Sequence, residues 1–439
     1  MKTLRTRIQN KKATLGIVGL GYVGLPVAAV FAREGFRVIG VDINQSRVET
    51  IRKGECPIEG REPGLAKLLE QVVGEGQFEA TSEYSYLANA DVILIAVETP
   101  IEDDHIPQYR ALRAAISSLG RVMKIGTLII VESTIAPGTM RSTVLPLIEE
   151  HSGLVVNKEF YLGHCPERVM PGKLLHNIRN VSRVVGGSTP ETAQTMIDLY
   201  RHIVDAELDA VDLVTAEIVK TAENAYRDVN IAFANELALI CEAVGGDVWK
   251  IRKLINKSPG RYVLYPGAGV GGHCIPKDPW LLVYGVKNKE DLVRLIPISR
   301  AINDAMPAHV LDLARETLKS VGTSLVGTKI LVLGYAYLEN SDDDRNSPSR
   351  KLTELAQNEG AEVIIHDPYI RNYDGNFYEL AEGCSCAIIM VKHPDYQELD
   401  VDVLANRLLK PIIIDGRNTF EGEPSSATNL IYRLIGVKP

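Results

Sequence analysis

A single cysteine, Cys274, lies in a loop rich in glycine and proline and is followed by a cation and a carboxylate. The loop spans residues 265–278 and reads YPGAGVGGHCIPKD. This composition excludes regular helix or strand and predicts a tight loop whose backbone can approach a ligand closely. Lys277 and Asp278 follow Cys274, and nearby positive charge favours the reactive thiolate. The loop alone is equally compatible with a nucleophilic cysteine and with a buried structural one.

A second chemical pattern is the glycine turn GLGYVG at residues 19–24. An apolar segment that predicts a strand precedes the turn, a helical pattern follows it, and a second predicted strand ends at Asp42. Glycines at this spacing permit a tight turn, close approach of a pyrophosphate and close helix packing. A carboxylate at Asp42 can bind both ribose hydroxyls and would repel a 2′-phosphate, which favours NAD over NADP. A Rossmann-like half without a dinucleotide, or one that binds FAD, remains an alternative.

Polar residues also follow three later predicted strands. The sequence after 90–97 is ETP, that after 126–131 is ESTIAPGT, and that after 160–163 is HCPERVMPG. Ligands of an open α/β sheet bind at the carboxyl ends of its strands, so these segments are candidate site loops. Helix N-capping by Ser or Thr, and a surface salt-bridging loop, are the plainer explanations.

Residues 213–244 contain neither proline nor glycine and predict one long helix. Lys220, Asn224 and Arg227 fall on one face of it at i, i+4 and i+7. Asn230 and Asn235 lie among apolar residues. A helix this apolar on several sides is expected to pack against something large, such as another subunit. A second helix is expected near 248–255.

The last third of the chain repeats the alternation of strands and helices. It contains no GxGxxG segment, so a second dinucleotide is not expected, although the nucleotide part of a substrate could bind there. His366 and His393 lack metal-ligand spacing and are interpreted as structural; no metal site is expected. The predicted strands are residues 329–334, 363–365, 387–391 and 411–414.

Composition limits the remaining choices. The 439 residues suffice for two or three domains, and the net charge of −8 argues against nucleic acid or an anionic membrane as a nonspecific partner. The six cysteines show no disulfide spacing, which favours reduced thiols and a cytoplasmic protein. The first residues are polar and basic rather than signal-like, and no apolar run reaches the length of a membrane span.

Several segments follow one another in an order typical of a known family. The segments GLGYVGLP, ESTIAPGT, HCPERVMPG, PGAGVGGHCIPKDP, GYAY and IIDGRN resemble the nucleotide-sugar 6-dehydrogenases nearly end to end. PERVMPG, RDVNIAFANEL and His273 before Cys274 are most similar to the branch that oxidises UDP-N-acetyl-D-mannosamine. UDP-glucose dehydrogenases usually carry serine at the position of His273.

The resemblance implies an α/β fold in which two Rossmann-like, doubly wound parallel-sheet domains are joined by a helical domain with one long central helix. The expected domains are an NAD-binding domain over 1–200, a central helical dimerisation domain with the cysteine loop over 201–310, and a UDP-sugar-binding domain over 311–439. Family members dimerise through the central helix, so a homodimer or higher homo-oligomer is expected.

The resemblance also implies a chemistry, the four-electron oxidation of the sugar C6 alcohol to a carboxylate with two NAD+. An aldehyde is a poor hydride donor because it lacks a tetrahedral oxyanion. Attack by Cys274 would supply one as a thiohemiacetal, and hydride loss would then give a thioester that water hydrolyses.

The same resemblance gives roles to five further residues. Lys220 and Asn224 would stabilise the oxyanion, and Lys220 could also carry a proton. Asp278, with a water held near Thr134, would handle protons. Glu167 would assist hydrolysis of the thioester.

Binding residues are implied in the same way, and Arg261 would reach the substrate of a neighbouring subunit. The NAD residues are Gly19, Gly21, Tyr22, Val23, Gly24, Asp42, Arg47, Thr99, Thr134 and Arg345. The UDP-sugar residues are Arg168, Val169, Lys220, Asn224, Arg227, Arg261, Gly271, Tyr337 and Arg417.

Two departures affect the choice of sugar and leave the chemistry intact. Leu338 occupies a place where the family commonly has lysine, and Arg261 lies one residue nearer Cys274 than the mannosamine pattern. UDP-N-acetylglucosamine, UDP-glucose and an N-acetylgalactosaminuronate-type substrate remain alternatives. A two-electron β-hydroxyacid dehydrogenase and a non-enzymatic nucleotide-sugar sensor are more remote ones.

Overall fold

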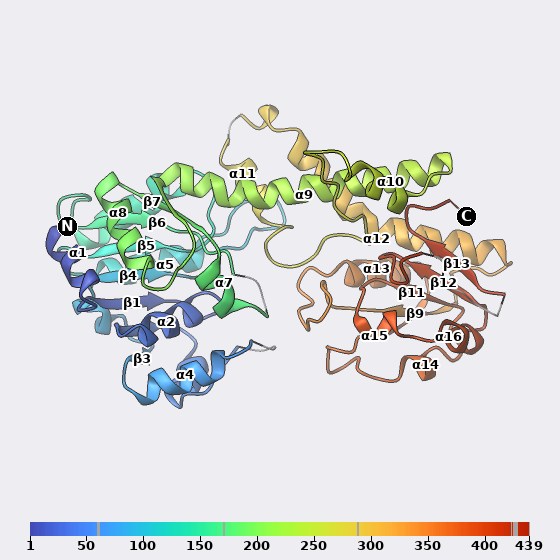
Figure 1. The fold of residues 1–439 in the computed structure, drawn as a ribbon, viewed down its shortest axis with the longest axis horizontal. Coiled ribbons are helices and arrows are strands. Elements are labelled where there is room, and N and C mark those ends of the chain that lie inside the picture. The colour runs from blue at the N-terminus through green and yellow to red at the C-terminus, as the bar shows by residue number, and fades with distance from the viewer. Residues whose placement is uncertain (59–61, 170–171, 288, 423, 425–428, 439) are drawn as a thin grey trace. The chain divides into compact units, whose positions relative to one another are not determined.

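The computed structural model describes residues 1–58, 62–169, 172–287, 289–422, 424 and 429–438. The chain divides into two compact units, Met1–Glu223 with Trp280–Asn288, and Asn224–Pro279 with Lys289–Pro439. Each unit contains its own β-sheet with helices packed on it (Figure 1). Met170 and Pro171 of the PERVMPG segment lie outside the described residues.

The described strands of the first unit form one eight-stranded sheet in the order β3-β2-β1-β4-β5-β6-β7-β8. All neighbours pair in parallel except β6 and β7, which are antiparallel. The strand order reverses between β1 and β4, the point where an open α/β sheet binds ligands. The strands are β1 (Thr14–Val18), β2 (Arg37–Val41), β3 (Phe78–Thr81), β4 (Val92–Ile95), β5 (Leu128–Val131), β6 (Tyr161–His164), β7 (Arg183–Gly187) and β8 (Leu208–Asp212).

Helices cover both faces of this sheet. Alternate residues of one strand enter opposite cores: Leu94 packs with α2 in one core, whereas Ile93 and Ile95 pack with α5 in the other. The helices are α1 (Lys2–Gln9), α2 (Gly24–Arg33), α3 (Gln45–Arg52), α4 (Leu65–Gly74), η1 (Tyr84–Asn89), α5 (Arg110–Gly120), η2 (Met140–Val144), α6 (Leu145–Ser152), α7 (Leu174–Asn180) and α8 (Pro190–Tyr200). The sheet is therefore doubly wound, as predicted.

The long helix α9 spans Leu213–Val244, and α10 spans Val248–Ile255, with the bounds expected from the sequence. Gly245 has a φ of +88° and follows the last helical residue, a conformation that favours glycine and ends the helix. Asp247 caps α10, because its carboxylate accepts hydrogen bonds from the backbone N–H of Trp249 and Lys250.

The second unit contains a parallel five-stranded sheet in the order β10-β9-β11-β12-β13 among the described residues. Its strands are β9 (Lys329–Leu333), β10 (Glu362–His366), β11 (Cys386–Ile389), β12 (Ile412–Asp415) and β13 (Ile431–Leu434). The remaining helices of the chain are α11 (Asp278–Tyr284), η3 (Glu290–Leu292), α12 (Leu295–Ser320), α13 (Pro348–Asn358), α14 (Phe377–Leu380), α15 (Pro394–Gln397) and α16 (Val401–Arg407).

The predicted fold class, two Rossmann-like parallel-sheet domains with a helical region between them in the chain, is confirmed. The boundaries proposed from the sequence, 1–200, 201–310 and 311–439, stay a prediction. The sequence reading did not include β3, β7, β8, α12 and β13.

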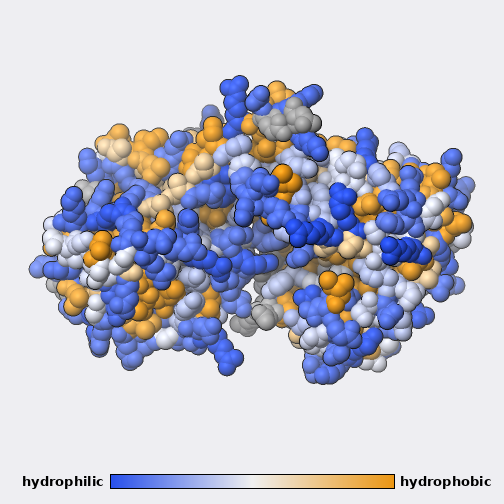
Figure 2. Space-filling view, turned by 180° about the vertical axis from the view of Figure 1, so that it is seen from behind, coloured by the Kyte–Doolittle hydropathy of each residue, from blue (hydrophilic) through white to orange (hydrophobic). Residues whose placement is uncertain are grey.

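The surface is largely polar on the face drawn in Figure 2, with apolar side chains scattered among charged ones. None of the described helices combines the length and the hydropathy needed to cross a membrane.

Candidate active site

The glycine turn between β1 and α2 has the geometry of a phosphate-binding loop. A Cβ atom on Gly19, whose φ is +91°, would lie 2.5 Å from the Ala96 carbonyl oxygen. A Cβ on Gly24 would lie 1.9 Å from the Gly19 carbonyl oxygen, whereas one on Gly21 would meet nothing within 4 Å. The first and third glycines thus permit packing, and the second leaves open space for a ligand. Val23 precedes α2, and its side chain makes no capping hydrogen bond, which suits a helix N-terminus that binds phosphate.

Asp42, which follows β2, binds the backbone of this turn. Its buried carboxylate accepts hydrogen bonds from the backbone N–H of Leu20 over 2.7 Å and of Asn44 over 2.8 Å. The Arg47 guanidinium lies 3.2 Å from Asp42 Oδ2. Because two carboxylate oxygens offer about four acceptor sites, Asp42 retains capacity for ribose hydroxyls. The residues of this turn therefore fit a dinucleotide, and Tyr22 lies half-buried within it.

The loops after β4 and β5 meet through a hydrogen bond of 2.6 Å from the Thr99 hydroxyl to the Thr134 carbonyl oxygen. Glu217 of α9 binds the later part of the loop after β5. Its carboxylate accepts hydrogen bonds from the backbone N–H of Gly138 and Met140, each over 2.7 Å. Burial raises the pKa of Glu217 to about 7. The structure therefore places Thr99 and Thr134 side by side at the carboxyl ends of adjacent strands, as expected.

Glu167 lies in a buried cluster of charged groups after β6. The Arg183 guanidinium of β7 lies 2.5 Å from Glu167 Oε2, and the backbone N–H of Arg168 donates to Glu167 Oε1 over 2.7 Å. Arg183 also lies 3.7 Å from Glu132, which accepts a hydrogen bond of 2.7 Å from the Tyr200 hydroxyl. Burial and the charge of Glu167 raise the pKa of Glu132 to about 7. One arginine thus contacts two carboxylates, and Glu132 keeps its proton to a higher pH than an ordinary glutamate does.

The side chain of Arg168 is held by several groups in the first unit. Its guanidinium donates to the Ser182 carbonyl oxygen over 2.7 Å and lies 3.1 Å from Glu223. Val169 is partly buried and packs against the core on one face of the sheet. Lys220 is a buried residue of α9. All three residues therefore belong to the first unit.

Cys274 is the one exposed cysteine of the six, all of which lie in the described residues and form no disulfide. Burial raises the pKa of Cys165 to about 12, and it also raises the pKa of Cys386 to about 12. Those thiols stay protonated and out of reach of solvent. Cys274 is therefore not the buried structural cysteine that the sequence left open, and its role as a nucleophile stays a prediction.

The residues that follow Cys274 form a compact polar group. Its carbonyl oxygen accepts from the backbone N–H of both Lys277, over 3.1 Å, and Asp278, over 2.8 Å. The buried Lys277 amine lies 2.8 Å from Asp278 Oδ1, and the Asn224 amide donates to Asp278 Oδ2 over 2.5 Å. The structure thus brings Asn224 and Asp278 together one turn beyond the thiol, while the catalytic roles of both residues stay predictions.

Tyr337 packs directly on the glycines before Cys274. A Cβ on Gly271 would lie 2.6 Å from Tyr337 Cβ, and one on Gly272 would lie 2.7 Å from the Tyr337 ring. His273 lies between these glycines and the cysteine, and burial, with smaller effects of Lys277 and Arg345, lowers its pKa to about 4. Its imidazole is therefore neutral at physiological pH and can both donate and accept a hydrogen bond.

Two arginines hold the loop through its backbone. Arg345 accepts, at its carbonyl oxygen, a hydrogen bond of 2.9 Å from the Gly272 N–H, while its guanidinium pairs with Asp343. Arg417 donates to the Gly269 carbonyl oxygen over 3.2 Å and to the Met390 carbonyl oxygen over 2.8 Å. Arg345, predicted to contact NAD, thus belongs to the same unit as the cysteine loop.

The last two predicted substrate residues are exposed arginines of the second unit. Burial raises the pKa of the Tyr337 hydroxyl, and the charge of Arg227 on α9 is among the effects that oppose this rise. Arg261 contacts the Pro259 carbonyl oxygen over 2.9 Å. The predicted residues therefore form two groups, one in each unit.

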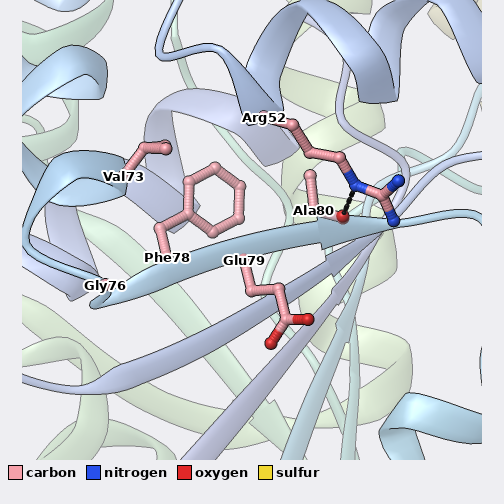
Figure 3. A pocket seen from close by; sticks show the side chains of 6 residues that line it. All are labelled: Arg52, Val73, Gly76, Phe78, Glu79 and Ala80. Carbon is pink, nitrogen blue, oxygen red and sulfur yellow. Dashed lines mark hydrogen bonds between the residues drawn. The ribbon is translucent and has the colours of Figure 1, made fainter.

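Two cavities in the described residues lie apart from these residues or at their margin. One of about 280 Å³ opens at the edge strand β3, where Arg52 donates to the Ala80 carbonyl oxygen over 2.8 Å (Figure 3). The other, of about 310 Å³, lies between α12 and the start of α13 beside Val270. Among the described residues, no three His, Cys, Asp or Glu side chains gather as metal ligands would.

Sequence reasoning did not single out Arg183, Glu132 and Tyr200. The available signal was a charged residue that opens the strand pattern RVVGG, since an arginine there must find a partner if it is buried. The pairing itself depends on the antiparallel contact of β6 with β7, which no local pattern indicates.

Comparisons with known proteins agree with this geometry. In the UDP-glucose/GDP-mannose dehydrogenase family, the NAD binding domain matches residues 13–204, the central domain 214–305 and the UDP binding domain 331–422. The predicted cofactor, NAD, is thereby confirmed.

Individual relatives match over almost the whole chain. A UDP-N-acetyl-D-mannosamine dehydrogenase of Pyrococcus horikoshii is 37% identical over 422 residues, which cover 96% of this chain and 99% of the relative. An NDP-N-acetyl-D-galactosaminuronic acid dehydrogenase of Ralstonia solanacearum is 35% identical, and the match covers 94% of this chain and 98% of that relative. The solved UDP-D-ManNAc dehydrogenase of Pyrococcus horikoshii superposes with a TM-score of 0.91 at 37% identity, over 96% of this chain and 99% of that structure. The chain therefore belongs to the UDP-glucose/GDP-mannose dehydrogenase family and is an NAD-dependent UDP-sugar dehydrogenase.

Proposed function

We propose that the protein oxidises the C6 hydroxyl of UDP-N-acetyl-D-mannosamine to the uronate through a covalent intermediate on Cys274. The observation that carries this proposal is the exposed Cys274 thiol, one turn before the polar group formed by Lys277, Asp278 and Asn224. A two-electron dehydrogenase has no use for such a thiol, whereas a four-electron oxidation needs one. Bound NAD+ supplies a hydride acceptor, once in each of the two oxidations.

In the first oxidation the C6 alcohol loses its proton to a base and its hydride from carbon, which leaves an aldehyde. Lys220 serves as a proton carrier, and the Asp278 carboxylate, oriented by Asn224, accepts protons through water. Thr134 helps to hold that water.

In the second oxidation the Cys274 sulfur adds to the aldehyde carbon, and its proton passes to a base. The resulting thiohemiacetal oxygen carries the charge, which Lys220 and the Asn224 amide stabilise. Loss of a second hydride gives a thioester. Water then attacks the carbonyl with help from Glu167, and the carboxylate product leaves as Cys274 regains its proton.

The choice of sugar is supported by the relatives and by His273. The mannosamine and galactosaminuronate dehydrogenases that match this chain are both named for N-acetylated sugars. A neutral His273 imidazole can donate a hydrogen bond to an uncharged acetamido group or accept one from it. UDP-N-acetylglucosamine, an N-acetylgalactosamine nucleotide and UDP-glucose are the alternatives.

The test is turnover on a panel of these UDP-sugars, with NADH counted per sugar consumed. We expect two NADH per sugar and the highest kcat/KM with UDP-N-acetyl-D-mannosamine. The Cys274→Ala variant should form no uronate, whereas Cys56→Ala, an alteration in the other unit, serves as the matched control. One NADH per sugar with accumulating aldehyde, or full activity of Cys274→Ala, would overturn the thioester route.

We also propose a homodimer through α9, in a cytoplasmic enzyme. Four large apolar residues at spacings of seven, seven and four lie exposed on this helix: Tyr226, Phe233, Ile240 and Val244. Such a stripe fits the same face of a second copy. Six cysteines without a disulfide fit a reducing compartment. Light scattering should report a dimer for the wild type and a monomer for Phe233→Asp; a wild-type monomer would contradict the dimer.

Arg261 is proposed to reach the neighbouring subunit's substrate. Mixing Arg261→Ala with Cys274→Ala would then restore turnover, because heterodimers contain one site with both an intact thiol and an intact arginine. No gain on mixing would place Arg261 in its own subunit's site.

A further inference from the structure

A chain of buried polar side chains connects α9 and α12 with Gly267, the first glycine of the cysteine loop. The Gly267 N–H donates to Asn235 Oδ1 over 2.8 Å, and Asn235 Nδ2 donates to Asn303 Oδ1 over 2.8 Å. Asn303 Nδ2 in turn donates to Asp228 Oδ1 over 2.7 Å. Asn235, Asn303 and Asp228 are fully buried, and all belong to the second unit.

The direction of this chain is fixed at both ends. A backbone N–H such as that of Gly267 can only donate, so the oxygen of Asn235 must face it. The Asp228 carboxylate is paired with the buried Arg300 guanidinium over 2.6 Å and accepts the Asn303 amide. With the two ends fixed, each asparagine has one orientation that satisfies its neighbours, which makes the network rigid.

The loop backbone at Gly267, which Asn235 contacts, has little room to move. A Cβ on Gly267 would lie 2.5 Å from the Arg417 guanidinium, which itself donates to the Gly269 carbonyl oxygen. At the other end of the glycine segment, the Asn346 amide donates to the Gly272 carbonyl oxygen over 3.0 Å. The backbone before Cys274 is therefore held from both ends, and Asn235 is the contact that α9 provides.

We propose that Asn235 is a positioning residue that holds the loop so that the Cys274 sulfur meets its substrate in the reactive geometry. The inference rests on the proposed role of Cys274 as nucleophile. A misplacement of about 1 Å at a reacting atom can cost roughly 100-fold in rate. The alternative is that Asn235 only satisfies buried polar groups and affects stability alone.

The decisive comparison is Asn235→Ala against Asn230→Ala. Asn230 is the matched control, an asparagine of the same helix whose amide donates to the Tyr226 carbonyl oxygen over 2.7 Å. The measurements are kcat and KM, the rate of Cys274 alkylation by iodoacetamide with Cys56 as internal reference, and hydrogen exchange of the peptide that contains Gly267.

We expect Asn235→Ala to lower kcat by about 100-fold with a smaller change in KM, to alter the alkylation rate of Cys274, and to accelerate exchange at Gly267. Asn230→Ala should leave all three unchanged. A lower Tm with unchanged kcat and unchanged Cys274 alkylation would assign Asn235 a purely structural role and overturn the proposal.

A second variant, Asn235→Asp, covers a failure of Asn235→Ala to fold. The aspartate keeps the volume and an acceptor for the Gly267 N–H, and burial favours its protonated form, whose O–H still donates to Asn303 Oδ1. It should therefore restore slow exchange at Gly267 and native Cys274 alkylation. Loss of both in Asn235→Asp would overturn the proposal. Absence of wild-type turnover with every UDP-sugar would refute the proposed function, and the exchange and alkylation data would still decide whether Asn235 positions the loop.

Discussion

Asn224 donates its side-chain amide to Asp278 across a separation of 54 residues, over 2.5 Å, and Lys277 lies 2.8 Å from the other oxygen of the same carboxylate. One group on α9 and one at the start of α11 thus fix a single carboxylate beside Cys274. Charge-assisted contacts of this kind orient a carboxylate strongly.

The first prediction concerns this carboxylate. Asp278→Asn removes the negative charge, so the buried Lys277 amine loses its ion pair and the proposed proton acceptor is gone. We expect kcat to fall by about 100- to 10,000-fold, the range for general-base removal, and Tm to fall as well. Glu49→Gln, at an exposed acid of α3, is the control for a lost charge. A kcat within a factor of about two of wild type would exclude Asp278 from proton transfer.

The second prediction concerns the choice of dinucleotide. Asp42→Ala removes the acceptor for ribose hydroxyls and releases Arg47 from its partner at 3.2 Å. The KM for NAD+ should rise about tenfold, equivalent to about 1.4 kcal/mol, and turnover with NADP+ should increase because the freed guanidinium can pair with a 2′-phosphate. Steady-state kinetics with both cofactors measure the change. An unaltered preference for NAD+ would show that Asp42 only supports the turn.

The third prediction concerns pH. The pKa of Glu132 is raised from 4.5 to about 7, so the folded chain keeps a proton there that the unfolded chain has released. Between pH 4.5 and about 7, rising pH therefore lowers the free energy of unfolding through this group, and the loss is complete above that window. Its magnitude is at most about 1.4 kcal/mol per pH unit.

Glu132→Gln keeps the acceptor for the Tyr200 hydroxyl and has no proton to lose. Its free energy of unfolding should fall less steeply from pH 4.5 to about 7 than that of the wild type, as measured by urea denaturation at several pH values. Glu217, with a pKa also raised to about 7, contributes the same slope in both proteins. Parallel curves for the two would show that Glu132 ionises normally.

The fourth prediction concerns the sugar. His273→Ser replaces a neutral imidazole with the smaller residue usual in UDP-glucose dehydrogenases. The ratio of kcat/KM for UDP-N-acetyl-D-mannosamine over UDP-glucose should fall at least about tenfold, the scale of discrimination by a few contacts. Lys351→Ser, on the exposed surface of α13, is the control. A ratio that does not change would place the recognition of the C2 substituent elsewhere.

The sequence by itself determined the features that local patterns encode. Gly19 and Gly24 already specified the turn, because backbone sterics leave few alternatives to glycine at these two positions. The bounds of α9 followed from the absence of proline and glycine over 32 residues, since helix propensity is a local property. The polar segments after β4, β5 and β6 were likewise predictable as loops that follow buried strands.

Tertiary structure decided the features that depend on distant partners. The loop sequence could not show that Cys274 is exposed while Cys165 is buried, because burial depends on what packs nearby. Asn235 and Gly267 lie 32 residues apart and meet only because α9 packs beside the loop. The contact of Arg183 with Glu167 exists because β7 pairs antiparallel with β6. Such contacts follow from packing of the whole unit, which no window of the sequence contains.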